Sequence, residues 1–137
     1  MTVLETAIMT LFNNDSGQGG YYDDIGGRLY NTEAPENATF PYAVFYSISR
    51  VPDYSFTDSD PHSEEVFLIQ FNTYSKDASK LVINGYEKNL NALFDWSSLT
   101  ITGYSLEKMQ RNYQRTIKVD DMWQNIVTYI VKIDSNT

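Results

Sequence analysis

Residues 26–48, GGRLYNTEAPENATFPYAVFYSI, decide how the rest of the chain can fold. The stretch starts with a glycine pair, passes through a short extended piece at residues 28–30, and crosses a polar connector. A strand then begins at Pro41, because proline lacks an amide hydrogen and suits the first position of a strand. From there Tyr42, Val44, Tyr46 and Ile48 alternate with Ala43, Phe45, Ser47 and Ser49. This period of two, in aromatic and β-branched residues, predicts a half-buried strand.

A helix is predicted before this stretch and a loop between the two. Residues 2–13 carry apolar side chains at helical spacing, with Thr2 as a plausible N-cap and Glu5 three residues later. Residues 17–27 are rich in glycine and acidic residues, and we expect them to form a mobile loop.

More strands and a second helix are predicted after it. Residues 63–73 form a strand with apolar side chains on both faces over part of its length. A helix starts after a cap at Ser75 or Asp77 and runs to about Trp96. Its apolar stripe consists of Leu81, Val82, Tyr86, Leu90, Leu93 and Phe94. Two final strands, 99–109 and 121–133, are joined by a turn or an extension around residues 112–120.

This order of elements predicts a single α+β domain over residues 1–137. Consecutive strands joined by loops favour a mainly antiparallel sheet of four to five strands, with the two helices packed on one face. We expect one core that contains Leu4, Ile8, Leu11, Val44, Ile69, Leu81 and Leu90.

Two helices can cover only one face of such a sheet, yet apolar residues also fall on the other face. These are Val66, Leu68, Met122, Ile126 and Ile130. One interpretation is scattered surface apolar residues, which are normal in soluble proteins. The other is contact with a neighbouring subunit.

Composition narrows the possible partners. Acidic residues outnumber Lys and Arg 18 to 10, the net charge is −8, and no segment gathers enough bases to neutralise a phosphate backbone. Sequence-specific binding to nucleic acid is therefore not expected. There is no cysteine, no apolar run long enough to span a bilayer and no basic N-terminal region typical of a signal peptide. We expect a soluble protein made in a cytoplasm, with no membrane partner.

The polar segment 53–65 is a second candidate contact surface, since Asp53, Asp58 and Asp60 give it negative charge without a base. Residues 58–62, DSDPH, begin like a calcium loop, but Ser63 stands where an EF-hand has its glycine. The one histidine, His62, has no nucleophile context beside it. We expect no catalytic residues, no metal and no cofactor, so the chain is not predicted to be an enzyme.

The pattern Gly27-Arg28-Leu29-Tyr30, Ala34-Pro35 and Phe40-Pro41-Tyr42-Ala43-Val44-Phe45, placed after an amphipathic helix, resembles the tail-completion proteins of long-tailed bacteriophages. These are also called tail terminator or head–tail joining proteins. The later elements fit as well, so the resemblance covers nearly the whole chain, although its specific residues lie within 27–46.

The resemblance implies a structural virion protein, made in the host bacterial cytoplasm and located at the head–tail interface. Such proteins form a hexameric ring at the head-proximal end of the tail. The ring ends growth of the tail tube and joins the tail to the head connector. The implied partners are further copies of the chain, the tail tube protein and the connector or head-completion protein.

An alternative from another class is a monomeric acidic module of the inhibitor or immunity type. Its negative charge and the 53–65 segment would steer a basic partner. This alternative leaves the apolar second face of the sheet without a role.

Overall fold

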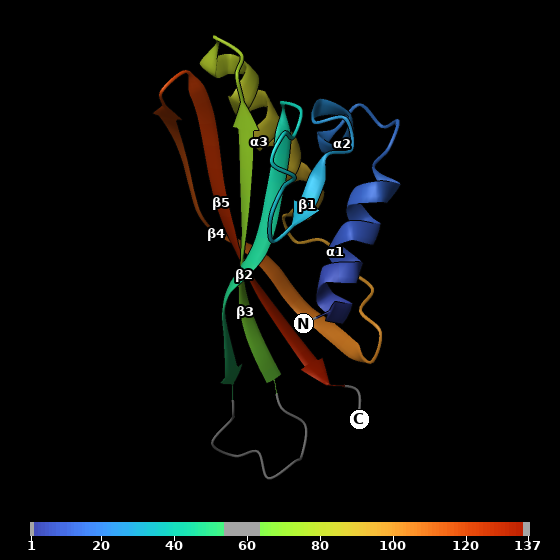
Figure 1. Cartoon of the computed structure of the whole chain (residues 1–137). Coiled ribbons are helices and arrows are strands. Elements are labelled where there is room, and N and C mark those ends of the chain that lie inside the picture. Colours follow the sequence, from blue (N-terminus) through green and yellow to red (C-terminus); the bar gives the residue numbers. More distant parts are fainter. Residues whose placement is uncertain (1, 54–63, 136–137) are drawn as a thin grey trace.

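A computed structural model describes residues 2–53 and 64–135 of the chain. In these residues a five-stranded sheet carries helices on one of its faces (Figure 1). The elements in chain order are α1 (Thr2–Asn14), α2 (Tyr21–Asp24), β1 (Leu29–Asn31), β2 (Tyr42–Asp53), β3 (Glu64–Ser75), α3 (Lys80–Phe94), β4 (Tyr104–Val119) and β5 (Met122–Ser135). The expected α+β class is therefore confirmed, with one more short helix, α2, than the sequence predicts.

The sheet order is β1-β2-β3-β5-β4, so β1 and β4 form its two edges. The pairs β2–β3, β3–β5 and β5–β4 are antiparallel, as expected. The short β1 pairs parallel to β2, with Leu29 opposite Ala43, which makes the sheet mixed. A parallel pair needs a crossover between its strands, and residues 32–41 supply a short one without a helix.

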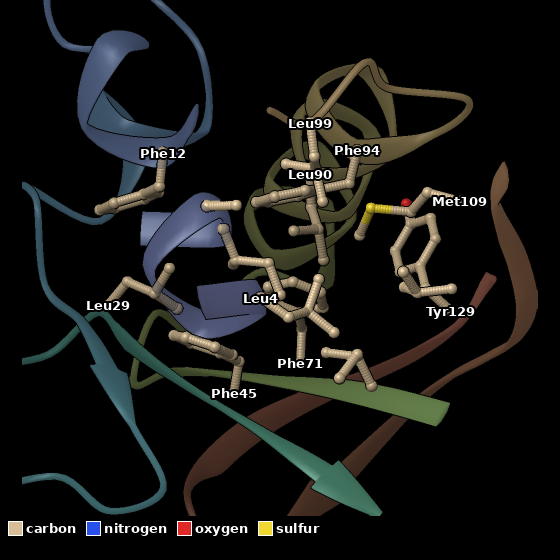
Figure 2. Close-up of a cluster of buried hydrophobic side chains, with 14 of the residues drawn as sticks. Leu4, Phe12, Leu29, Phe45, Phe71, Leu90, Phe94, Leu99, Met109 and Tyr129 are labelled. Carbon is tan, nitrogen blue, oxygen red and sulfur yellow. The ribbon is translucent and has the colours of Figure 1, made fainter. Parts of the chain in front are cut away.

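Side chains of alternating strand residues face the helices and form the core. On β3 these are Phe67, Ile69 and Phe71, and on β5 they are Val127, Tyr129, Val131 and Ile133, all buried. Phe71 lies at the centre of an aromatic group, with its ring 5.7 Å from that of Phe45 and 4.7 Å from that of Phe94. Figure 2 shows this group with Leu4 of α1 and Leu90 of α3 closing over it.

Helix α3 begins later than expected but turns most of its predicted stripe to the core: Leu90 and Phe94 are buried, and Tyr86 and Leu93 pack against the core. Its N-cap is Ser79, whose hydroxyl accepts a hydrogen bond from the Leu81 amide at 3.2 Å. Ser75 belongs to β3 instead, and Asp77 accepts from the Ser79 amide in the connection.

The burial of α3 residues differs from the prediction at its N-terminal turn. Ile83, Leu90 and Phe94 are fully buried, whereas Leu81 in the first turn is 80% exposed. The prediction that Leu81 belongs to the core is wrong, because Leu81 lies on the exposed side of the first turn, whose buried side holds Ile83. Leu4, Ile8, Ile69 and Leu90 are buried as expected, and Leu11 packs half-buried against the core.

Val44 is buried, but on the opposite side of the sheet. Ala43 and Phe45, its neighbours in β2, face the helices, so Val44 points away from them. The connector at residues 32–36 lies beside it.

The expected loop at 17–27 is an ordered segment that contributes to the core. Tyr21 and Ile25 are fully buried, and residues Tyr21–Asp24 form α2. Two carboxylates hold the chain that precedes this helix: Asp23 accepts from the Gly17 and Gly19 amides, and Asp15 accepts from the Tyr22 amide at 3.0 Å. These bonds replace the missing regular structure, so glycine-rich composition here does not mean disorder.

The last two strands are longer than predicted. β4 runs without interruption to Val119, through the region 112–120 that could have held a turn, and the two residues Asp120 and Asp121 connect it to β5. Irregularities in pairing between Leu106 and Lys108 and between Arg111 and Tyr113 let the strand stay paired along this length.

Candidate assembly surface

The sheet has a face that no helix covers, which we call the helix-free face. Its side chains come from the strand positions that alternate with the core positions. They are Tyr42, Val44 and Tyr46 of β2, Val66, Leu68, Gln70, Asn72 and Tyr74 of β3, Met122, Gln124, Ile126, Thr128 and Ile130 of β5, and Lys108, Gln110, Tyr113, Arg115, Ile117 and Val119 of β4.

All five apolar residues selected from the sequence lie on this face. Val66, Leu68, Met122, Ile126 and Ile130 are each half-buried. Leu68 pairs directly with Ile130, whereas Ile126 stands opposite Asn72 and Met122 lies at the β4–β5 turn. The apolar side chains therefore form two or three small groups rather than one continuous patch.

A polar network, not predicted from the sequence, separates these groups. Gln70 donates from Nε2 to the Tyr46 hydroxyl at 2.7 Å and to Asn72 Oδ1 at 2.9 Å. Asn72 is nearly buried, and its Nδ2 also reaches the Tyr46 hydroxyl at 3.4 Å. The sequence feature that could have predicted this network is the pair of polar residues at alternate positions between Leu68 and Tyr74. The Tyr46 hydroxyl that joins them comes from the neighbouring strand β2, which the sequence does not show.

Beside this network the helix-free face is hollowed near the β1 edge. The hollow has a volume of about 490 Å³ and is bounded by residues 32–36 on one side and by strand side chains on the other. Three tyrosines line it, Tyr42, Tyr46 and Tyr74, and the rings of Tyr42 and Tyr74 are 5.1 Å apart. Its charged lining residues are Glu33 and Glu36, both exposed.

The opposite edge of the sheet is basic. β4 holds Lys108, Arg111, Arg115 and Lys118 but a single acidic residue, Glu107. That is four of the ten Lys and Arg residues of the chain, in a protein whose net charge is −8.

Two of these cations are engaged on the helix side of β4. Arg111 pairs with Asp95 at 3.4 Å, and the Lys118 ammonium stands 5.3 Å from the centre of the Trp123 ring. Lys108 and Arg115 point to the helix-free face, and Arg115 is exposed. The helix-free face is thus acidic and aromatic at one end and basic at the other.

Of the acidic residues predicted as a contact surface in segment 53–65, the structure describes only some. Asp53 is the last residue of β2 and pairs in register with Glu64, so it belongs to the sheet rather than to a loop. Asp58, Asp60, His62 and the calcium-like segment lie outside the described residues.

We also searched residues 2–53 and 64–135 for metal ligands, membrane-spanning helices and groups with shifted pKa values. There, no three His, Cys, Asp or Glu side chains gather as metal ligands would. Among the described helices, none has both the length and the apolar content needed to cross a membrane. The strongest pKa shifts belong to Tyr21 and Tyr129, where burial raises the pKa above its ordinary value. These tyrosines lie in the core between helices and sheet, so they serve packing rather than a site.

Comparison with solved structures shows which class of fold this is. The chain superposes on a chain from a structure described as the virion of a native gene transfer agent (GTA) particle, with a TM-score of 0.72. The match covers 91% of this chain and 92% of that chain at 9% sequence identity. The two proteins therefore share a fold over almost their whole lengths. No protein-family model matches the sequence, and no curated protein matches it.

Proposed function

We propose that this protein is a structural component of the virion of a phage or phage-like particle, and that it acts there as a tail-completion subunit. In this proposal, copies of the chain form a hexameric ring at the head-proximal end of the tail. The ring ends growth of the tail tube and presents the surface that joins the head connector. The protein then has no catalytic role and needs no cofactor.

The observation that carries the proposal is the near-complete structural match to a virion chain, with 91% and 92% coverage. A local motif shared with many folds would not extend over both chains in this way. The match agrees with the motif resemblance of residues 27–46, which was found independently of the structure.

The helix-free face supports assembly rather than a solitary protein. Leu68, Ile126 and Ile130 are half-buried apolar side chains on a sheet face without a covering layer. Contact with a neighbouring copy would remove them from water, which is favourable at about 25 cal/mol per Å² of apolar surface. A monomeric acidic module would leave them exposed, and its basic edge strand β4 would have no purpose.

The test is to delete the gene in a strain that produces the particle and to examine the lysate by electron microscopy. We expect filled heads and separate tails, some longer than normal, with joining restored by the gene supplied in trans. A matched control is the same complementation with Lys88→Ala, an exposed residue of α3 far from the helix-free face. Normal joined particles in the deletion strain would contradict the proposed role.

A further inference from the structure

We propose that the basic edge strand β4 of one copy docks against the acidic, tyrosine-lined hollow at the β1 edge of the next copy, with Arg115 entering that hollow. This inference rests on the proposed function, because it names the contact that would close the ring. In this proposal, each of the two edges binds another copy of this chain.

The sheet order places the two surfaces where a ring needs them. β1 and β4 are the opposite edges of the sheet, so contact between them is head-to-tail. Closed rings of more than two copies require this kind of contact, in which one patch meets a different patch on the next subunit. Contact between two β4 strands would be two-fold and would stop at a dimer.

The two edges carry opposite charge, as a head-to-tail contact between them requires. At one edge, Lys108 and Arg115 face the helix-free side. At the other, Glu33 and Glu36 line the hollow, and neither carboxylate has an ion-pair partner within residues 2–53 and 64–135. The nearby Lys76 ammonium lies 4.6 Å from the centre of the Phe40 ring, outside the hollow. Complementary edges attract each other, and like edges repel.

The chemistry of the hollow suits a guanidinium group. Carboxylates accept its N–H donors in a planar, two-bond geometry, and tyrosine rings offer faces on which it can stack. The Tyr42 and Tyr74 rings lie side by side in the lining of the hollow, and the Tyr46 hydroxyl accepts a hydrogen bond from Gln70. An arginine is a better fit for this combination than a lysine.

The register of the sheet puts Arg115 level with the hollow. Arg115 pairs with Ile126, Ile126 with Asn72, Asn72 with Val44, and Val44 with Tyr30. One row perpendicular to the strands therefore joins the arginine at one edge to the lining of the hollow, Asn72 and Val44, near the other edge. A neighbouring copy displaced along this row, without sliding along the strands, brings its Arg115 to the hollow.

β4 is also an edge strand, and the Trp96 amide donates to its Met109 carbonyl at 2.8 Å, on the part of the strand before Arg115. The strand is 16 residues long, and β5 is its single neighbour in the described sheet. Such a long edge exposes backbone groups that another chain can pair with or cover. Its polar and charged side chains discourage random pairing and favour a partner of opposite charge.

The experiment uses the absence of native cysteine in the full chain. Ala34→Cys places a thiol at the hollow and Tyr113→Cys places one beside Arg115, and neither removes a charge. The two variants are purified separately, mixed and treated with a short bis-maleimide linker. We expect cross-linked dimer in the mixture and none in either variant alone. The doubly substituted chain should give a ladder that ends at a closed ring. Lys88→Cys on α3, mixed with Tyr113→Cys, is the matched control and should not cross-link.

A charge exchange tests the role of Arg115 itself. Arg115→Glu in the Tyr113→Cys partner should lower the cross-linking rate by about tenfold or more, since it sets like charges against each other. Combining it with Glu33→Lys and Glu36→Lys in the Ala34→Cys partner should restore the rate, as coupled positions do in a double-mutant cycle. Circular dichroism of each variant checks that it is folded.

Four results would overturn the proposal: efficient cross-linking of Tyr113→Cys with itself, equal yields with Lys88→Cys, no rescue by the exchanged charges, or no cross-linked species at all. The readout is separate from that of the proposed function. Particles that contain the protein while cross-linking fails would remove this contact and leave the virion role. Cross-linking without incorporation into particles would support this contact between copies and contradict the virion role.

Discussion

At the scale of single residues, two buried tyrosines tie the helices to the sheet through polar contacts. The Tyr21 hydroxyl and Thr73 Oγ1 of β3 are 2.6 Å apart, and Tyr129 of β5 donates to Asp95 Oδ1 at 2.8 Å, just after α3. Burial raises the pKa of both tyrosines, and at Tyr129 the bond to Asp95 raises it further. Both hydroxyls therefore hold their protons in the folded protein where an unfolded chain would lose them.

This shift predicts a loss of stability at alkaline pH. The ordinary tyrosine pKa is 10.0, and the folded-state values of Tyr21 and Tyr129 lie above it. Below the ordinary pKa both tyrosines are protonated in the folded and in the unfolded state, so the free energy of unfolding keeps its full value. As pH rises above 10.0 the unfolded state releases protons first, and stability falls. Urea unfolding at neutral pH and above pH 10.0 measures this fall. Tyr21→Phe should make it shallower, and an unchanged slope in that variant would contradict the prediction.

Leu81 and Leu90 of α3 provide a matched pair of substitutions. Leu90 is fully buried, so Leu90→Ala should lower the free energy of unfolding by about 2–5 kcal/mol through lost burial and a cavity. Leu81 is 80% exposed, so Leu81→Ala should change it by no more than about 0.5 kcal/mol. Denaturant titration of both variants is the measurement. Equal losses would mean that the helix presents a different face to the sheet.

At the scale of elements, the β4–β5 hairpin depends on a very short connection. Asp120 has a φ of 56°, in the left-handed region, and with Asp121 it joins strands of 16 and 14 residues. Asp and Asn tolerate this region better than most residues, and β-branched residues tolerate it poorly.

Asp120 therefore controls the stability of the hairpin. Asp120→Val should destabilise the protein by roughly 1–2 kcal/mol, the cost of a left-handed conformation with a bulky Cβ. Asp120→Gly should be neutral or slightly stabilising, since glycine adopts a positive φ without strain. Thermal unfolding followed by circular dichroism compares the two. A Val variant as stable as the Gly variant would show that the turn is not confined to this conformation.

At the scale of the whole molecule, the proposed ring requires the helix-free face to meet a neighbour. A charge within such a contact would be buried without a partner, at a cost of several kcal/mol per interface. Leu68→Asp and Ile126→Asp should therefore leave the monomer folded and abolish the ring, giving heads and tails that do not join. Circular dichroism tests folding, and electron microscopy of lysates tests joining. Normal particles from both folded variants would place the contact elsewhere.

The charge of the molecule predicts its behaviour toward DNA. With a net charge of −8 the protein should not bind duplex DNA, even at low salt, because like charges repel. The basic residues of β4 do not change this expectation, since Arg111 is paired with Asp95 and Lys118 stacks on Trp123. A gel shift at low ionic strength is the measurement, and tight binding that weakens with salt would count against it.

Alternating patterns in the sequence alone determined which side of β3 and of β5 is buried, whereas on β2 Val44 was assigned to the wrong side. Phe67, Ile69 and Phe71 on β3, and Val127 and Tyr129 on β5, are buried as their period of two predicts. The same alternation placed Leu68 and Ile126 on the opposite face, where the structure has them. Neighbouring residues suffice for this, because the pleat sends successive side chains to opposite faces.

The tertiary structure decided what depends on residues far apart in the chain. The parallel pairing of β1, the burial of Tyr21, the exposure of Leu81 and the row that sets Arg115 level with the hollow all follow from packing and strand register. Local sequence does not contain this information, because a strand's partner and a helix's covered face are set by contacts across the whole fold. The apolar part of the assembly surface was therefore predictable, and its charged edges were not.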